Sequence, residues 1–315
     1  MQPPYAVSST PDLNNGTPTL KAASDIEFPE YEVNISGIKL SSPYSFDFSD
    51  LVKELKSSGM NTIFLNVDTN DVGKYERFVR KAHMEGISVH AVLFENFNSS
   101  EKGAYKACQD SLNAVLDYNN KSLAPFDGID IYIKPSDKEG SEDTIDYKIL
   151  LETAYQKVGK NISVSASIPP NYPTSEIDKI APSVDFFIVR AYSESIEELS
   201  YASSIVDAIS LQTMEIRSAG SKELIEVSVD EGFKDKVSIQ KLFAALADYY
   251  SNDSAFLGVS TSNYDAYACL PVKADLEKAY PEKKESYNYL ILGFWALLAI
   301  VILLGAYDHF KLKRD

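Results

Sequence analysis

A short β-rich run followed by an amphipathic helical run recurs along most of this chain. Eight such β-rich runs follow one another: YEVNISGIKL, NTIFLNVD, SVHAVLFEN, FDGIDIYIKP, NISVSASIPP, VDFFIVRAYS, KELIEVSVDEG and AFLGVSTSNYDAY. Strands that alternate with helices pair in parallel through right-handed crossovers. Eight strand–helix units within about 250 residues therefore predict an α/β fold, a closed (β/α)8 barrel of the TIM type.

The alternative is an open doubly wound sheet, which would usually carry a Gly-rich phosphate loop after its first strand. The stretch SGIKLSSPYS, at the end of the first strand-like run, is not such a loop. The sequence therefore favours the closed barrel.

The helical runs carry their own signals. In FDFSDLVKELKSSG, Leu51, Val52 and Leu55 share one face, and Gly59 follows as a C-cap.

The C-terminal segment YLILGFWALLAIVILLGAY carries no charge. Its apolar run is just long enough to cross the ~30 Å hydrocarbon layer, and tyrosines lie at its edges as in an aromatic belt. We therefore expect one C-terminal transmembrane helix after the barrel. The predicted organisation is a flexible leader (1–28), the barrel (29–280), a juxtamembrane linker (281–288), the transmembrane helix (289–307) and a short basic tail (308–315).

The orientation in the membrane follows from charges and sequons. The basic tail KLKRD favours a cytoplasmic C-terminus, although Lys283 and Lys284 on the other flank weaken that signal. The first residues contain no signal peptide, so either Met1 replaces a removed signal or the protein is tail-anchored in the cytoplasm. N-glycosylation sequons occur in mild excess over chance, which favours a barrel outside the cytoplasm. The acceptors are Asn15, Asn34, Asn98, Asn120, Asn161 and Asn252.

The net charge and the composition argue against nucleic-acid and metal partners. The formal charge of −16 argues against a nucleic-acid partner, because no run supplies clustered Lys and Arg. The three histidines match no metal-ligand spacing; His83 is predicted on a helix surface and His90 in a strand. We predict no metal and no other cofactor. Cys108 and Cys269 form either one long-range disulfide or two small core residues.

Barrel enzymes place their chemistry at the C-terminal ends of the strands, the mouth of the barrel. Polar and charged side chains follow most of the predicted strands at that end. The candidate ligand-binding residues are Asn66, Asp68, Glu95, Asp130, Tyr132, Lys134, Arg190, Tyr192, Asp230 and Asn263. Because loops face water, a barrel without a ligand would also have polar strand ends, so this set alone identifies no function.

The fourth strand-like run carries the most specific motif. DGIDIYIK resembles DGxDxDxE, the strand-four signature of glycoside hydrolase family 18, the chitinase-like barrels. Asp127, Gly128 and Asp130 match that signature. Tyr132 replaces its third Asp, and Lys134 replaces its terminal Glu. The sixth and eighth runs are also similar to their family counterparts, but Ser262 stands where a Trp floors the sugar site.

The resemblance implies a reaction in which the substrate's acetamido group is the nucleophile and the terminal Glu protonates the leaving oxygen. Lys134 cannot supply that acid, and Tyr132 cannot carry the negative charge that balances the intermediate. We therefore expect a degenerate catalytic motif and assign no catalytic residue. The degenerate motif consists of Asp127, Asp130, Tyr132 and Lys134.

Three hypotheses follow. The first, which we favour, is a non-catalytic, membrane-anchored chitinase-like barrel at the cell surface. It would bind a glycan or serve as a structural or interaction subunit of a membrane complex. The second is an active glycoside hydrolase with displaced carboxylates, for which Glu95, Glu194 and Asp230 are the candidates. The third is a tail-anchored cytoplasmic enzyme in which Lys134 forms a Schiff base.

Overall fold

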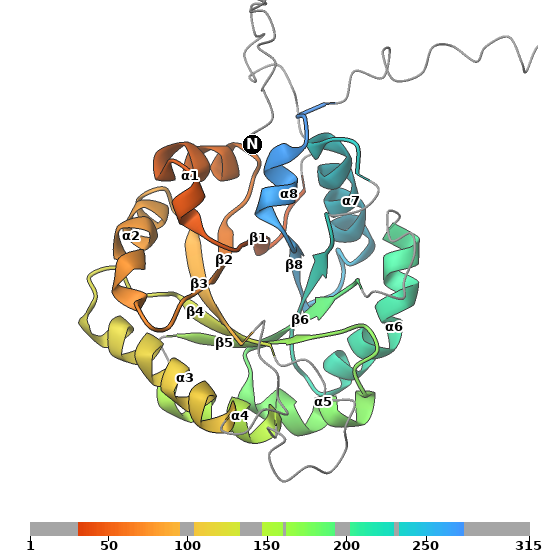
Figure 1. The fold of residues 1–315 in the computed structure, drawn as a ribbon. Coiled ribbons are helices and arrows are strands. Elements are labelled where there is room, and N and C mark those ends of the chain that lie inside the picture. The colour runs from red at the N-terminus through yellow and green to blue at the C-terminus, as the bar shows by residue number, and fades with distance from the viewer. Residues whose placement is uncertain are drawn as a thin grey trace, which may run out of the picture.

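The eight predicted strands are present and close into a barrel. The computed structural model describes residues 31–94, 104–132, 147–159, 162–192, 202–229 and 233–273. Each strand pairs in parallel with the next, and the last pairs with the first. The strands are β1 (Ile35–Leu40), β2 (Thr62–Asn66), β3 (Ser88–Leu93), β4 (Gly128–Ile131), β5 (Ser163–Ile168), β6 (Phe186–Arg190), β7 (Glu223–Val227) and β8 (Phe256–Thr261). The closed barrel is thus confirmed, and the open sheet is wrong (Figure 1).

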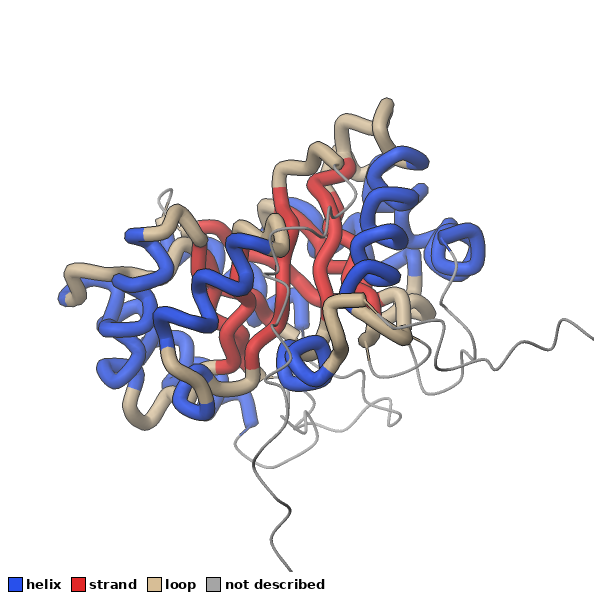
Figure 2. The backbone as a smooth tube through the Cα atoms, turned by 90° about the horizontal axis from the view of Figure 1, so that it is seen from above, coloured by secondary structure: helices blue, strands red, loops and turns tan. Residues whose placement is uncertain are grey.

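Helices surround the strands, as Figures 1 and 2 show. The α-helices are α1 (Phe48–Ser57), α2 (Glu76–Met84), α3 (Ala104–Lys121), α4 (Tyr147–Val158), α5 (Thr174–Ile180), α6 (Ala202–Ser218), α7 (Lys236–Tyr249) and α8 (Tyr264–Cys269). Short 3₁₀ helices lie between them: η2 (Pro43–Ser45), η3 (Val72–Tyr75) and η4 (Ala181–Ser183). Asp47 caps α1 by accepting from the backbone N–H groups of Ser49 and Asp50.

Successive side chains of a strand point alternately toward the helices and into the barrel, and this alternation produces two separate apolar regions. Outward-facing residues such as Ile38 and Leu40 of β1 are fully buried between the strands and the helices. A smaller cluster fills the inside of the barrel. Its members are Phe64, Val92, Phe186, Ile188 and Leu224. The inside of the barrel is therefore a packed core over part of its length, and only the remaining positions are open to polar residues.

Two strand glycines allow close approach inside the barrel and between neighbouring strands. A Cβ on Gly128 would lie 2.3 Å from Nδ1 of His90, whose ring packs 5.2 Å from that of Phe64. Burial lowers the pKa of His90 to about 4, so this interior ring is neutral at physiological pH. Gly258 has a φ of +147°, and a Cβ there would lie 1.9 Å from the backbone oxygen of Ile35. Gly258 therefore lets β8 close against β1.

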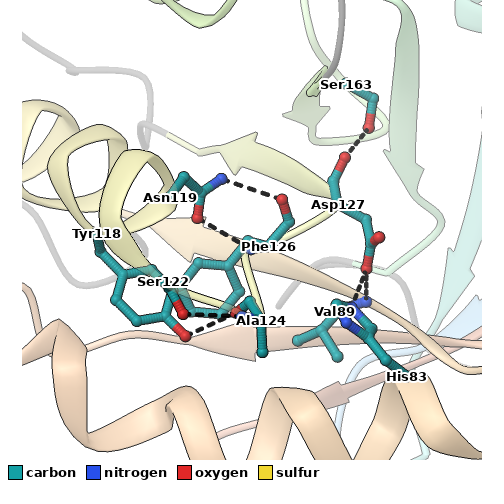
Figure 3. Close-up of polar contacts among 9 residues, drawn as sticks. All are labelled: His83, Val89, Tyr118, Asn119, Ser122, Ala124, Phe126, Asp127 and Ser163. Carbon is teal, nitrogen blue, oxygen red and sulfur yellow. Dashed lines mark hydrogen bonds and ion pairs between the residues drawn. The ribbon is translucent and has the colours of Figure 1, made fainter.

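The first carboxylate of the strand-four motif, Asp127, holds the backbone of the neighbouring strand. Its Oδ2 accepts from the N–H of Val89 (2.7 Å) and lies 2.9 Å from Nε2 of His83 (Figure 3). Its own N–H donates to the carbonyl oxygen of Val89 at 2.9 Å. At the start of β6, Asp185 makes the same pair of bonds to Val164, both at 2.7 Å. These two aspartates tie β3 to β4 and β5 to β6 at the N-terminal face of the barrel.

Two sequence predictions need correction. The eighth strand ends at Thr261 rather than continuing through Tyr267, because Asn263 accepts from the N–H of Ala266 and starts α8. The disulfide alternative is wrong, since both cysteines are free: Cys108 is buried as a small core residue, whereas Cys269 is exposed.

The membrane helix is not tested by the structure. Within the ranges that the structure describes, no helix is long and apolar enough to cross a bilayer. The predicted transmembrane segment (289–307), its linker, the basic tail and the leader (1–28) all lie outside those ranges.

The role of Asp127 predicts a stability effect. Asp127→Ala removes the acceptor of a buried backbone N–H, so we expect the free energy of unfolding to fall by about 1–2 kcal/mol. His83→Ala removes only a partly exposed contact and should change it by less than about 0.5 kcal/mol. Urea unfolding followed by circular dichroism measures both. An Asp127→Ala protein as stable as the parent would contradict this backbone role.

Candidate functional site

Among the residues that the structure describes, four charged side chains lie inside the barrel, on four different strands. We call them the interior charge cluster: Lys39 of β1, Asp130 of β4, Arg190 of β6 and Glu226 of β7. Their exposed fractions are 3%, 2%, 6% and 2%. The residues before and after each of them face the helices, so strand alternation turns these four inward. With two residues of each sign, the cluster can balance its own charge.

Asp130 is held by two hydroxyl groups of the adjacent strand. Ser165 donates to its Oδ1 at 3.0 Å, and Ser167 donates to its Oδ2 at 2.8 Å. Burial raises the pKa of Asp130 to about 6, while the nearby charges of Arg190 and Lys39 and the Ser167 hydrogen bond oppose that rise. Asp130 is therefore mostly ionised at neutral pH and is compensated from within the barrel.

Arg190 joins the two carboxylates of the cluster to the aromatic residue of the strand-four motif. Its Cζ lies 3.8 Å from the centroid of the Tyr132 ring, a stacked cation–π contact. Its Nε lies 3.4 Å from Oε1 of Glu226. The same Oε1 accepts the hydroxyl of Tyr192 at 2.6 Å. Tyr132, which replaces an Asp of the family motif, thus serves as a platform for a buried guanidinium.

This arrangement is poorly suited to donating a proton to a substrate. A general acid must reach the leaving oxygen, directly or through one water. Asp130 has a raised pKa, but both its oxygens accept serine hydroxyls and its side chain is almost fully buried. Glu226 is equally buried and is engaged by Tyr192 and Arg190. What these residues can do is form a rigid, charge-balanced floor beneath the mouth.

The structure brings together four of the predicted ligand-binding residues: Asp130, Tyr132, Arg190 and Tyr192. Asn66 ends β2 and is partly buried. Asp68 instead lies in the loop after β2, where its Oδ2 pairs with Lys74 at 2.8 Å. Asn263 caps α8. The other predicted mouth residues and displaced carboxylates, Glu95, Lys134, Glu194 and Asp230, lie outside the described residues.

Sequence reasoning missed Lys39, Glu226 and two of the three serines of β5, Ser165 and Ser167. The sequence contained a signal for both charged residues. Lys39 is a lone charge between Ile38 and Leu40, and period-two alternation places it on the opposite, inward side. Glu226 stands in the same way between Ile225 and Val227. In the part of the chain that the structure describes, no group of three or more His, Cys, Asp and Glu side chains could hold a metal ion.

Burial of Asp130 predicts a pH-dependent stability. An unfolded Asp ionises near pH 3.8 and folded Asp130 near pH 6, so the folded protein binds more protons between these values. Asp130 therefore contributes stability below about pH 4 that is lost as pH rises through about 6. We expect Asp130→Asn to gain about 3 kcal/mol relative to the parent between pH 4 and 7.

Chemical unfolding at a series of pH values measures this difference. Glu223→Gln is the matched comparison, because burial raises the pKa of Glu223 from 4.5 to about 7. Its gain should extend to a pH about one unit higher than that of Asp130→Asn. A stability difference between parent and Asp130→Asn that is independent of pH would contradict the assigned burial of a charged Asp130.

The Arg190–Glu226 pair predicts a second stability effect. Arg190→Leu leaves Glu226 buried without its cation, so we expect a loss of about 3–5 kcal/mol. The double variant Arg190→Leu/Glu226→Leu removes both charges and should recover most of that loss. Thermal unfolding of the parent, both single variants and the double variant provides the cycle. Simple additivity of the two single losses would contradict a direct pair.

Comparison with known proteins agrees with this geometry. Residues 55–255 match the family model of the glycosyl hydrolases family 18. No curated protein matches the chain by sequence. Three similar solved structures each cover about three quarters of the chain and more than nine tenths of their own length. They are a GH18 chitinase from Pseudoalteromonas aurantia (10% identity, TM-score 0.53, 72% of this chain and 93% of that chain), concanavalin B (14%, 0.51, 74% and 94%) and the xylanase-α-amylase inhibitor protein XAIP-I with trehalose (12%, 0.52, 74% and 94%).

At these identities the solved structures support the fold, while the family model supports membership. The matched segment covers most of the barrel, from the last turn of α1 to the residue before β8. The resemblance of DGIDIYIK to the strand-four signature is thereby confirmed. This chain belongs to the glycosyl hydrolases family 18.

Proposed function

We propose that this protein is a non-catalytic, membrane-anchored member of its family that binds a glycan at the mouth of the barrel. The observation that carries the proposal is that the motif residues of strand four make their contacts within the barrel. Asp130 accepts two internal serine hydroxyls, and Tyr132 supports the guanidinium of Arg190. The two motif residues that the structure describes at this point are thus engaged within the barrel.

The replaced motif positions support the absence of hydrolysis. Glycoside hydrolysis needs a carboxylic acid at the leaving oxygen, and the position of that acid in the family motif holds Lys134. A lysine carries its charge as an ammonium group and cannot take over this acid. Because Tyr132 also replaces a motif Asp, both the acid and its neighbouring carboxylate are missing from the motif.

The relatives are compatible with a binding role. The structural neighbour XAIP-I is named as an inhibitor of a xylanase and an amylase and was solved with trehalose. A barrel of this shape is thus found in a protein that is not named for its own hydrolysis. For the present chain, the interior charge cluster supplies a rigid polar floor on which a saccharide can rest, with the aromatic rings of Tyr132 and Tyr192 at its edge.

Membrane anchoring is the second part of the proposal. The uncharged segment 289–307 is long enough to span a bilayer, and the basic tail after it favours a cytoplasmic C-terminus. The sequons favour a barrel outside the cytoplasm. The protein would therefore present its barrel at the cell surface and hold it there by one helix.

Saccharide titration tests the binding role. We expect the full chain in detergent to bind chito-oligosaccharides saturably, as measured by calorimetry, and to release no shorter sugars on prolonged incubation. Tyr132→Ala should weaken binding at least tenfold, which corresponds to the ~1.4 kcal/mol expected from loss of an aromatic contact and its Arg190 stack. Tyr155→Ala, at an exposed tyrosine of α4, is the matched control.

Three outcomes would contradict the proposal. Release of shorter sugars would show hydrolysis, and Glu95→Gln, Glu194→Gln and Asp230→Asn would then identify its carboxylates. Failure to bind any glycan, combined with specific capture of a membrane protein, would favour the role of an interaction subunit. Equal weakening by Tyr132→Ala and Tyr155→Ala would place the binding site away from the mouth.

A further inference from the structure

The place where the chain leaves the barrel decides which end of the barrel faces the membrane. After α8, the backbone oxygen of Pro271 accepts from the N–H of Lys236 (3.0 Å), and that of Val272 accepts from the N–H of Val237 (3.2 Å). Lys236 and Val237 are the first residues of α7, and α7 follows the C-terminal end of β7. The exit segment is therefore fixed at the mouth side of the barrel.

A second group of contacts fixes this corner of the barrel further. The carboxylate of Glu54 on α1 pairs with Nζ of Lys236 and accepts the hydroxyl of Tyr264 at 2.8 Å. The ammonium group of Lys236 also lies 5.0 Å from the centroid of the Tyr267 ring. The start of α7, the short α8 and the exit segment are thus joined to α1 by partly buried polar contacts.

The sequons that the structure describes lie at the opposite end. Asn34 directly precedes β1, Asn120 is in the last turn of α3 before β4, and Asn252 is in the connection from α7 to β8. All three are exposed, and all three stand in segments that lead into the N-terminal ends of strands. Asn98 and Asn161 lie outside the described residues and carry no part of this argument.

We infer that the barrel stands on the membrane with its mouth toward the bilayer and with the N-terminal face, which bears N-glycans at Asn34, Asn120 and Asn252, turned away. The inference rests on the proposed membrane anchor. It identifies the ligand of the mouth as a saccharide borne by the same membrane, such as a glycolipid head group, rather than a soluble polymer approaching from outside.

The position of the exit segment supports this orientation. Fifteen residues, 274–288, separate the exit segment from the uncharged segment. Fifteen residues span about 50 Å at most. Because the chain leaves the barrel at the mouth side, the mouth is the end that the uncharged segment can hold closest to the bilayer. Glycans at Asn34, Asn120 and Asn252 would keep the opposite face away from it.

Energy transfer to labelled lipids tests the orientation. The full chain, made without glycans and reconstituted in liposomes, is labelled with a maleimide dye at the exposed Cys269 near the exit segment. The matched protein is Cys269→Ser/Asn252→Cys, which carries the dye at the N-terminal face. Cys108 is buried and stays unlabelled in both. We expect at least twofold greater transfer to an acceptor lipid from the dye at position 269 than from the dye at position 252.

Equal transfer, or greater transfer from position 252, would overturn the orientation. No transfer from either position, with the protein absent from the liposomes, would instead remove the membrane anchor while leaving the saccharide titration valid. The glycan assignment has its own test. Full chain routed through the secretory pathway of eukaryotic cells should carry N-glycans at residues 34, 120 and 252 by mass spectrometry, and three unoccupied acceptors would overturn that assignment.

The ligand assignment is tested with the same liposomes. In one arm, a chito-oligosaccharide lipid is in the same liposomes as the protein; in the other, the same lipid is in separate liposomes. We expect the lipid in the first arm to compete with the free saccharide for the mouth at least tenfold more strongly. Equal competition from both sources would overturn the preference for a ligand in the same membrane. Tyr132→Ala should abolish competition in either arrangement.

Discussion

Burial of the Asp130 carboxylate is the constraint on which the inside of the barrel depends. An isolated carboxylate removed from water costs several kcal/mol unless hydrogen bonds and opposite charges offset that cost. Ser165 and Ser167 supply the hydrogen bonds, and Lys39 and Arg190 supply the charges. Arg190 is itself buried and needs Glu226 and the Tyr132 ring. One acidic residue on β4 thus determines the polar residues of β1, β5, β6 and β7.

The family motif on strand four divides into two structural roles in this chain. Asp127 faces outward at the N-terminal end, where it closes a hydrogen-bonded pair with the Val89 backbone. Asp130 faces inward and organises the interior charge cluster. Each residue therefore has structural contacts of its own within the barrel, and these contacts account for its presence without a catalytic role. Retention of half of a catalytic motif is, for this reason, weak evidence for catalysis.

The sequence predicted the barrel well, because hydrophobic alternation and helix caps are local signals. Gly59, for example, ends α1 as its position suggested. The sequence analysis placed the end of β8 wrongly, because it extended the strand to Tyr267 although Asn263 starts a helix. The site was predicted less completely. Asp130, Tyr132 and Arg190 stood out as polar strand ends. Ser165 and Ser167, in contrast, can be recognised as partners of Asp130 only from the pairing of neighbouring strands.

The two ends of the barrel carry different kinds of connection. At the N-terminal face, the connections are short, for example 58–61 before β2 and 184–185 before β6. At the mouth, the connections 41–47 after β1 and 67–75 after β2 are longer, and each contains a short 3₁₀ helix. Long connections on a rigid frame are where recognition usually resides. The two carboxylates of the interior charge cluster have partners within the barrel, so the frame beneath these connections does not need a ligand to balance them. Replacement of the strand-four acid by Lys134 is therefore compatible with an intact barrel frame.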